Sequence, residues 1–385
     1  MPPEIDFALV LNLHQPAGNL DHLLDHEPWE ARQILWALDR IPRSLWPHED
    51  HARVHLALSG TLLETLASPG FQERAYGTVD CGSLLWHLQN TRTIDVLGTA
   101  YYHPVLPLIP PADWDEQLTR WLGIGRHLLG RTEFGGFWPP EMGFRMELIP
   151  LLRRLGYRYV LVDSDHAVPV TPMSWPELRY RPHLARFGGA EIVVVVRDRE
   201  LSDAQESGTD PGWFIDEVRE RTRWCDFRPL VTTCTDGDNG GWFRNPAPGA
   251  NFWSWFHDEL LARVAGGDGG GVRPTFIRDH LDRYGAHGEV TVRPGAWNTG
   301  WHHGAGFIQW TGSAAQRDAL TAVSEVSALL HAAAAEGSDV EAARWRLLRA
   351  QTSCNLYWGE AWVDRCHADL AEARRALRAR AIAMR

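Results

Sequence analysis

The sequence predicts an α/β fold whose parallel strands favour closure into a barrel, followed by a helical C-terminal part. Short, almost continuous apolar runs alternate with helical patterns, which is typical of parallel strands covered by helices. Seven runs are predicted as strands: Ile5–Leu13, Val54–Ser59, Thr93–Thr99, Gly135–Trp138, Tyr157–Val162, Ile192–Val196 and Leu230–Cys234. From Ser313 onward the chain changes character and shows helical patterns.

Two segments between the predicted strands have helical spacing. One is Asp113–Leu129. In the other, after Glu141, apolar residues recur at i, i+3, i+4 and i+7 and Gly156 supplies a stop; they are Leu148, Leu151, Leu152 and Leu155. In the C-terminal part, Ser313 and Gln316 have the spacing of a capping box, so a long helix is expected to begin there.

Size and charge limit the classes of partner. The chain has 385 residues and 44% hydrophobic content, enough for a large core. Its net charge is −11, and all 38 basic residues are arginines that are not gathered in one patch. Neither a nucleic acid nor an acidic membrane surface is therefore the expected partner, and a neutral substrate fits better. The sequence predicts no oligomeric state.

Cysteine and histidine spacing predicts neither a disulfide framework nor a metal site. The five cysteines are odd in number and show no Cys-x-x-Cys pair. The run His48-x-x-His51-x-x-x-His55 matches no common metalloenzyme pattern, so a solvated surface is expected there. The adjacent His302 and His303 also invite a metal interpretation. We expect no metal and no cofactor.

The N-terminal segment gives an expectation about location. The apolar run Ile5–Leu13 has no basic region before it and no small-residue cleavage pattern after it. Cytoplasmic residence is therefore the default expectation. No apolar run reaches the ~18–20 residues that are needed to span a bilayer.

Polar clusters follow several of the predicted strands. His14 follows the first strand, His103 the third, Glu141 the fourth, Asp163 the fifth and Asp236 the last. In barrels of parallel strands, functional residues gather where the strands end. We therefore expect these side chains to share one face of the fold.

Two of these positions have the setting of reactive acids. Glu141 lies in the run Gly136–Phe144, among aromatic residues, prolines and glycines. Asp236 and Asp238 end an apolar strand, with glycines and Trp242 behind them. A glycosidase commonly needs one carboxyl group to protonate the leaving oxygen and another to attack the sugar or activate water. The pair therefore indicates glycosidic chemistry.

Structural roles remain open for the same residues. Glu141 could stabilise a helix N-terminus, and the Asp236–Gly240 segment could be a plain turn. His14 and His103 could be hydrogen-bonded core residues at strand ends. Five tryptophans could merely fill core volume, with two or three of them facing sugar instead; they are Trp138, Trp242, Trp297, Trp301 and Trp358.

Five segments together resemble glycoside hydrolase family 57. In order along the chain they are Leu11–Pro16, Tyr101–Leu108, Trp138–Glu141, Asp236–Asp238 and Thr352–Gly359. The resemblance implies a seven-stranded (β/α) barrel of distorted TIM-barrel type, expected over residues 1–300. A C-terminal helical bundle, expected over 301–385, would contribute to the active-site cleft. The resemblance also implies action on α-glucans with retention of configuration.

The resemblance implies roles for individual residues. Glu141 falls at the position of the family nucleophile and Asp236 at that of the general acid/base, while Asp238 stands where a glutamate is more usual. We expect contacts with the sugar from a second set of side chains: His14, Gln15, His103, Trp138, Asp238, Trp242 and Trp358.

Three function classes stay open. The first is a retaining glycoside hydrolase or transglycosylase on α-1,4-glucan (amylose, glycogen or malto-oligosaccharides), of amylase, 4-α-glucanotransferase or branching type, working through a covalent glycosyl-enzyme intermediate. The second is a catalytically silent glucan-binding homologue. The third is a polysaccharide deacetylase, which needs a His-x-x-x-His pair for its metal after the aspartate motif, and none is suitably placed.

Overall fold

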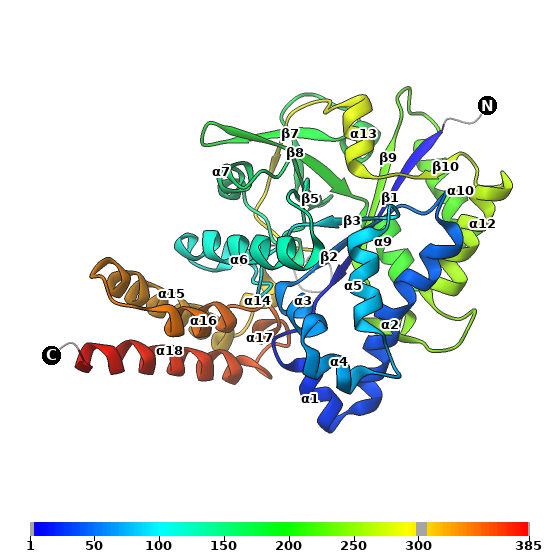
Figure 1. The fold of residues 1–385 in the computed structure, drawn as a ribbon. Coiled ribbons are helices and arrows are strands. Elements are labelled where there is room, and N and C mark those ends of the chain that lie inside the picture. Colours follow the sequence, from blue (N-terminus) through cyan, green and yellow to red (C-terminus); the bar gives the residue numbers. More distant parts are fainter. Residues whose placement is uncertain (1–3, 298–305, 384–385) are drawn as a thin grey trace.

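The main sheet is organised around the first strand. The structure, a computed structural model, describes residues 4–297 and 306–383 (Figure 1). Strand β1 (Ile5–Leu13) is fully buried and pairs in parallel with β9 (Leu230–Asp236), β2 (Val54–Leu58) and β10 (Val272–Pro274). Strand β2 pairs in turn with β3 (Ile94–Leu97). The parallel pairing brings the carboxyl ends of these strands to one side of the sheet.

A second sheet contains the remaining predicted strands. Its order is β4 (Gly136–Phe137), β5 (Tyr159–Asp163), β8 (Ala190–Arg197) and β7 (His183–Phe187). The first three are parallel, whereas β7 pairs antiparallel with β8. A separate two-stranded ribbon joins β6 (Ala167–Pro169) to β11 (Val290–Val292).

The two larger sheets are joined at two places. Gly98, after β3, pairs with Phe137 of β4, and its backbone N–H donates to Gly136 O over 2.9 Å. On the other side, Asp198 N–H donates to Thr232 O of β9 over 2.9 Å. A Cβ on Gly98 would lie 2.2 Å from the Tyr157 hydroxyl, so only glycine allows this approach.

All seven predicted strands are present, with ends that differ by a few residues. They are distributed over two sheets rather than one continuous ring. Four further strands, β6, β7, β10 and β11, were not predicted. Three of the four have only three residues, too short for a periodic pattern to appear.

Helices surround both sheets. The α-helices before the C-terminal part are α1 (Asn19–His26), α2 (Pro28–Leu45), α3 (Gly60–Ala67), α4 (Pro69–Ala75), α5 (Cys81–Asn90), α6 (Pro111–Leu129), α7 (Ile149–Arg154), α8 (Trp175–Tyr180), α9 (Arg199–Glu206), α10 (Pro211–Thr222), α11 (Gly240–Arg244), α12 (Asp258–Gly266) and α13 (Ile277–Tyr284). Short 3₁₀ turns are η1 (Trp46–His48), η2 (Leu106–Leu108), η3 (Pro140–Met142) and η4 (Met146–Leu148), and η5 (Phe252–His257) is a π-helix.

The helix expected after Glu141 is divided. The segment forms η4 and then the six-residue α7, because Pro150 cannot donate a backbone hydrogen bond and fits only the first turn of an α-helix. Leu148 and Leu152 are nevertheless buried, as the apolar spacing predicted. The stop at Gly156 is confirmed, since this residue has a φ of 94°.

The C-terminal part is helical, as predicted. It contains α14 (Ile308–Thr311), α15 (Ala314–Ala335), α16 (Glu341–Ala350), α17 (Cys354–Tyr357) and α18 (Val363–Ala383). Helices α15, α16 and α18 lie together at the side of the molecule away from the N-terminus (Figure 1). The capping box of Ser313 and Gln316 is confirmed, with both reciprocal hydrogen bonds formed.

One buried carboxylate connects this helical part to α6. Asp113 Oδ1 accepts hydrogen bonds from Ser327 Oγ over 3.0 Å and His331 Nε2 over 2.8 Å. Asp113 Oδ2 accepts from Gln351 Nε2 over 2.6 Å. Because α15, α16 and α6 share this acceptor, the helical part has a fixed place beside the sheets.

The expectation of a solvated histidine run is wrong for one of its members. His51 is exposed, but His55 lies within β2 and is fully buried. His55 Nδ1 donates to Leu9 O and His55 Nε2 accepts from Ile277 N–H, each over 3.0 Å. These bonds occupy both ring nitrogens. His302 and His303 lie outside the described residues.

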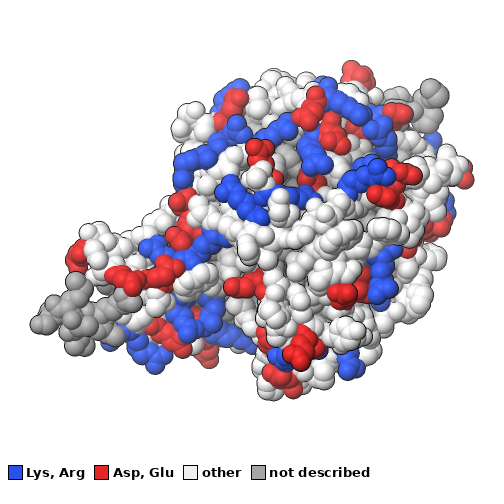
Figure 2. Space-filling model, in the orientation of Figure 1, with Lys and Arg blue, Asp and Glu red and all other residues white. Residues whose placement is uncertain are grey.

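Charged side chains of the two signs are mixed on the surface, and the cysteines form no disulfides among the described residues. Arginines and carboxylates are interspersed over the face seen in Figure 2, and all five cysteines are unpaired. Within the described ranges, no helix combines the length and apolar character that crossing a bilayer demands.

Candidate active site

Glu141 is held in an unusual backbone conformation at the end of β4. It lies in η3 with φ 57° and ψ 19°, and the following Met142 has φ 50°. Positive φ is rare outside glycine, and it costs free energy that surrounding contacts must offset. The backbone N–H of Trp297 supplies one such contact, since it donates to the backbone oxygen of Glu141 over 3.0 Å.

The Glu141 carboxylate accepts hydrogen bonds on both oxygens. Trp297 Nε1 donates to Oε2 over 2.8 Å, and Ser353 Oγ donates to Oε1 over 2.7 Å. Arg199 in turn donates to Trp297 O over 2.8 Å and to Asp163 Oδ1 over 3.0 Å. Trp297 is therefore fixed from two sides and orients the carboxylate.

Asp236 lies at the end of β9, directly opposite Asn12 in the β1 register. Asn12 Nδ2 donates to Asp236 Oδ1 over 3.0 Å, so Asn12 Oδ1 is left to accept from His103 Nε2 over 3.2 Å. The other His103 nitrogen lies 3.2 Å from Ser353 Oγ, the hydroxyl that bonds Glu141. A chain of four side-chain contacts thus connects the two acids.

Asp238 and the histidines form the next layer of the site. Gln15 Nε2 donates to Asp238 Oδ2 over 3.1 Å, and Asn19 Nδ2 donates to Gln15 Oε1 over 2.9 Å. His14 stacks on His103 with ring centroids 4.1 Å apart. Neither nitrogen of the His14 ring has a hydrogen-bond partner among the described residues. The His14 ring lines the cavity, although both of its nitrogens are themselves buried.

The environment raises the pKa of all three acids. Burial, followed by repulsion from Asp236, raises the pKa of Glu141 to about 7, against the hydrogen bonds from Ser353 and Trp297. The same two causes raise the pKa of Asp238 to about 7. Desolvation also raises the pKa of Asp236, although its side chain keeps some exposure. Burial and mutual repulsion therefore favour the protonated form at each of the three carboxyl groups, which couples their titrations.

Burial also keeps the two histidines neutral, because it disfavours the charged form of each and so lowers its pKa. Burial lowers the pKa of His14 to about 3. Burial, followed by the neighbouring His14, holds the pKa of His103 well below its usual range. Neutral imidazoles can both donate and accept hydrogen bonds, which suits contacts with sugar hydroxyls.

These side chains line one cavity of about 310 Å³. Its lining comprises Asn12, His14, Gln15, Pro16, Asn19, Glu30, Ile34, His103, Glu141, Asp236, Asp238, Asn239, Arg244, Cys354, Tyr357, Trp358 and Trp362. The cavity lies where β1, β3, β4 and β9 end, and α17 closes one side of it. Of the strand-end residues expected to share a face, Asp163 alone does not line the cavity; it forms ion pairs with Arg197 and Arg199.

Two of the tryptophans expected to contact sugar do not line the cavity. Trp138 is fully buried and packs edge-on behind Trp297, with ring centroids 5.2 Å apart. Trp242 is partly buried against Gly208, where a Cβ would lie 3.4 Å from its ring. Trp358, by contrast, is 52% exposed and lies at the cavity. Trp301 lies outside the described residues.

Sequence reasoning missed several polar partners of the two acids. Asn12 and Ser353 stand inside the segments Leu11–Pro16 and Thr352–Gly359, so their motifs were the available signal. Trp297 had no comparable signal, because it reaches Glu141 from 156 positions away. Arg244, whose Nε donates to Asp238 O over 2.9 Å, was also missed.

Comparison with known proteins assigns the family. Residues 35–265 match the model of glycosyl hydrolase family 57. The chain belongs to this family. An α-amylase of Pyrococcus horikoshii is 28% identical over 200 residues, and a 4-α-glucanotransferase of Thermococcus kodakarensis is 27% identical over 198. These matches cover 52% and 51% of this chain but only 28% and 27% of those proteins.

Solved structures agree with the fold over nearly the whole chain. A family 57 branching enzyme from Pyrococcus horikoshii has a TM-score of 0.74 at 16% identity and covers 97% of this chain and 88% of its own. A 4-α-glucanotransferase from Thermococcus litoralis has a TM-score of 0.71 at 18% identity, covering 97% and 60%. A family 57 α/β domain with a helical C-terminal part is therefore the fold of this chain.

Replacing Trp297 by phenylalanine is expected to shift the pH dependence of this family 57 protein. The indole N–H stabilises ionised Glu141, so its loss should raise the pKa of Glu141 by about one unit, given the worth of a hydrogen bond to a charged group. Under the activity proposed below, the acid limb of kcat/KM on maltoheptaose should move to higher pH by the same amount.

Trp138→Phe is the matched control for that shift. Trp138 Nε1 has no hydrogen-bond partner among the described residues, so losing it should leave the acid limb in place. Identical acid limbs for Trp297→Phe, Trp138→Phe and the unmodified protein would show that Trp297 does not support the ionised carboxylate.

Proposed function

We propose that the protein is a retaining glycoside hydrolase or transglycosylase that acts on α-1,4-glucan. The observation that carries this proposal is the placement of Glu141 and Asp236 on one cavity, connected through Ser353, His103 and Asn12. Retention requires the two carboxyl groups to lie about 5–5.5 Å apart, and this separation is expected here.

Glu141 is the proposed nucleophile and Asp236 the proposed acid/base. In the first step Asp236 gives its proton to the glycosidic oxygen while Glu141 attacks the anomeric carbon and the glycosidic bond breaks. In the second step Asp236 takes a proton from water or from a sugar hydroxyl, which displaces Glu141. The raised pKa of Asp236 supports its protonated starting state. Burial also raises the pKa of Glu141, and the hydrogen bonds from Trp297 and Ser353 oppose that rise and so favour the ionised form that the attack needs.

Sugar contacts are proposed for the polar and aromatic lining of the cavity. His14 and Gln15 offer hydrogen bonds to hydroxyl groups, and Asp238 lies beside Gln15. His103 also lines the cavity, but its ring nitrogens contact Asn12 and Ser353, so a sugar hydroxyl would have to replace one of these partners. Trp358 offers an exposed ring next to Tyr357, with ring centroids 4.9 Å apart. Trp138 and Trp242 are assigned to packing, because they are absent from this lining.

The fold fits this chemistry if the two sheets act as one distorted seven-stranded barrel. Its order would be β1, β2, β3, β4, β5, β8 and β9, closed by the Gly98–Phe137 bridge and the bond from Asp198 to Thr232. We propose that residues 1–300 form this catalytic unit and that 301–385 form the helical bundle. Ser353 and Trp358 would be the contribution of the bundle to the site.

Product analysis with maltoheptaose tests the proposal. Shorter products alone indicate hydrolysis, and longer products indicate transfer to a second glucan. Similarity to amylases, 4-α-glucanotransferases and branching enzymes supports both outcomes. Binding without turnover on every α-glucan tested would contradict the proposal and identify a silent homologue. Activity that a chelator abolishes would point to a metal-dependent reaction instead.

A further inference from the structure

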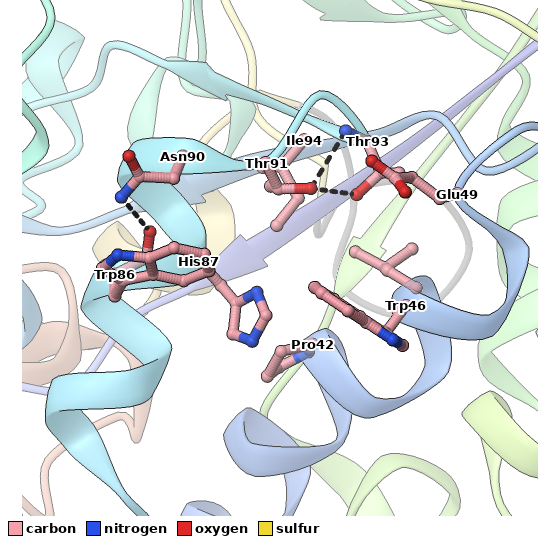
Figure 3. A pocket seen from close by; sticks show the side chains of 10 residues that line it. Pro42, Trp46, Glu49, Trp86, His87, Asn90, Thr91, Thr93 and Ile94 are labelled. Atoms are coloured by element: carbon pink, nitrogen blue, oxygen red, sulfur yellow. Dashed lines mark hydrogen bonds between the residues drawn. The ribbon is translucent and has the colours of Figure 1, made fainter.

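A second cavity lies far from the proposed active site. It has a volume of about 220 Å³ and is formed between the end of α2 with η1 on one side and α5 on the other (Figure 3). Its floor includes Thr93 and Ile94 at the start of β3, and both are buried. The active-site cavity lies where the strands end, so the two cavities are at opposite ends of β3.

Two exposed indoles flank this cavity. Trp46 is 68% exposed and Trp86 is 54% exposed. The His87 ring lies between them and contacts each edge-on, with centroids 5.8 Å and 5.2 Å away (Figure 3). An exposed tryptophan costs hydration free energy, and two on one concavity indicate a binding site rather than scattered surface residues.

The rim of the cavity carries polar groups with spare hydrogen-bonding capacity. Asn90 Nδ2 donates to Trp86 O over 2.8 Å, which leaves its carbonyl oxygen available. The His87 ring also lines the cavity, and its contacts with Trp46 and Trp86 are edge-on ring contacts. Glu49 is paired with Arg92 Nε over 3.0 Å, so the rim carries little net charge.

This chemistry matches a neutral sugar chain. A glucosyl ring has apolar C–H faces that pack on an indole and hydroxyl groups around its edge that need donors and acceptors. An anionic polymer does not fit, because the rim offers one arginine already paired and the chain carries a net charge of −11. An apolar peptide would leave Asn90 and His87 unsatisfied at the rim.

We propose that the cavity between Trp46 and Trp86 binds glucosyl units of an α-glucan, separately from the active-site cavity. This inference rests on the proposed function for its choice of sugar. A polymer that occupies both cavities on one molecule is held at two points, so its effective concentration at the active site rises. A short oligosaccharide bound at one cavity does not gain in this way, because it does not reach the other cavity at the opposite end of β3.

Hydroxyl-radical footprinting with maltoheptaose tests binding at each place separately. On the Glu141→Gln protein, which cannot consume the sugar, we expect protection of Trp46 and Trp86 and also of Trp358. Trp224, which is 79% exposed and lines neither cavity, should remain unprotected. Protection of Trp358 alone would overturn the second site and leave the proposed function standing. Protection of Trp46 and Trp86 without Trp358 would support the second site and count against the proposed function. Protection of none of the three tryptophans would overturn both the second site and the proposed function.

Kinetics on long and short substrates give an independent readout. The Trp46→Ala/Trp86→Ala protein should have an unchanged kcat/KM on maltoheptaose and a KM for glycogen raised about tenfold. Trp224→Ala is the control for losing an exposed indole, and thermal melting checks that each variant is folded. Equal KM values for glycogen in the double variant and the control would overturn the proposal.

Discussion

Glu141→Gln is expected to abolish turnover of malto-oligosaccharides while folding and glucan binding persist. Glutamine keeps the shape of the side chain; its carbonyl oxygen can accept the hydrogen bond from Trp297, and its amide NH2 can donate to the Ser353 hydroxyl. It cannot attack the anomeric carbon, so kcat should fall by several orders of magnitude. Single-turnover assays and a binding isotherm with maltoheptaose measure the two effects separately.

External azide provides a direct check on the role of Glu141. The small anion can fill the space on the nucleophile's side, attack the anomeric carbon and displace the leaving group of an activated α-glucoside. A β-glycosyl azide should then accumulate with the variant and not with the unmodified protein. Turnover by Glu141→Gln at the rate of the unmodified protein would rule out the covalent role.

Asp236→Asn is expected to lower kcat/KM on maltoheptaose by roughly 10²–10⁴-fold, the usual contribution of a general acid. α-Glucosyl fluoride needs no protonation to leave, so formation of the glycosyl-enzyme from it should be far less affected. Asp236 must be protonated at the start, so activity normally falls as pH rises through its raised pKa. Asparagine does not titrate, and this alkaline limb should disappear.

Asp238→Asn is the matched variant at the neighbouring carboxyl group. Repulsion between the two carboxylates favours the protonated form of each. Removing Asp238 should therefore lower the pKa of Asp236 and move the alkaline limb to lower pH without removing it. Profiles of Asp236→Asn and Asp238→Asn that both overlay that of the unmodified protein would show that neither residue has the proposed role.

The sequence indicated the acids of the active site, but it did not indicate the second cavity. Trp46 and Trp86 stand in a helical turn and a helix, where an indole more often packs into a core. Both lie within the range that matches the family model, but neither lies in one of the five motif segments. Their exposure, and the cavity between them, depend on how α2 and α5 pack beside β3, which local spacing does not report.

The sequence by itself determined the seven strands, the helical C-terminal part and the acids at the strand ends. Apolar runs and spacing report whether a residue is buried within its own element, and that is enough to locate Glu141 and Asp236 after β4 and β9. The capping box at Ser313 is equally local, since its partners are three residues apart.

Only the tertiary structure decided which distant side chains meet these acids. The β1–β9 register sets Asn12 opposite Asp236, and Trp297 and Ser353 reach Glu141 from 156 and 212 positions away. The tertiary structure also buries Trp138 behind Trp297 and leaves Trp358 at the cavity. Periodicity describes the burial of a position, whereas these contacts depend on the packing of whole elements, which is a property of the complete fold.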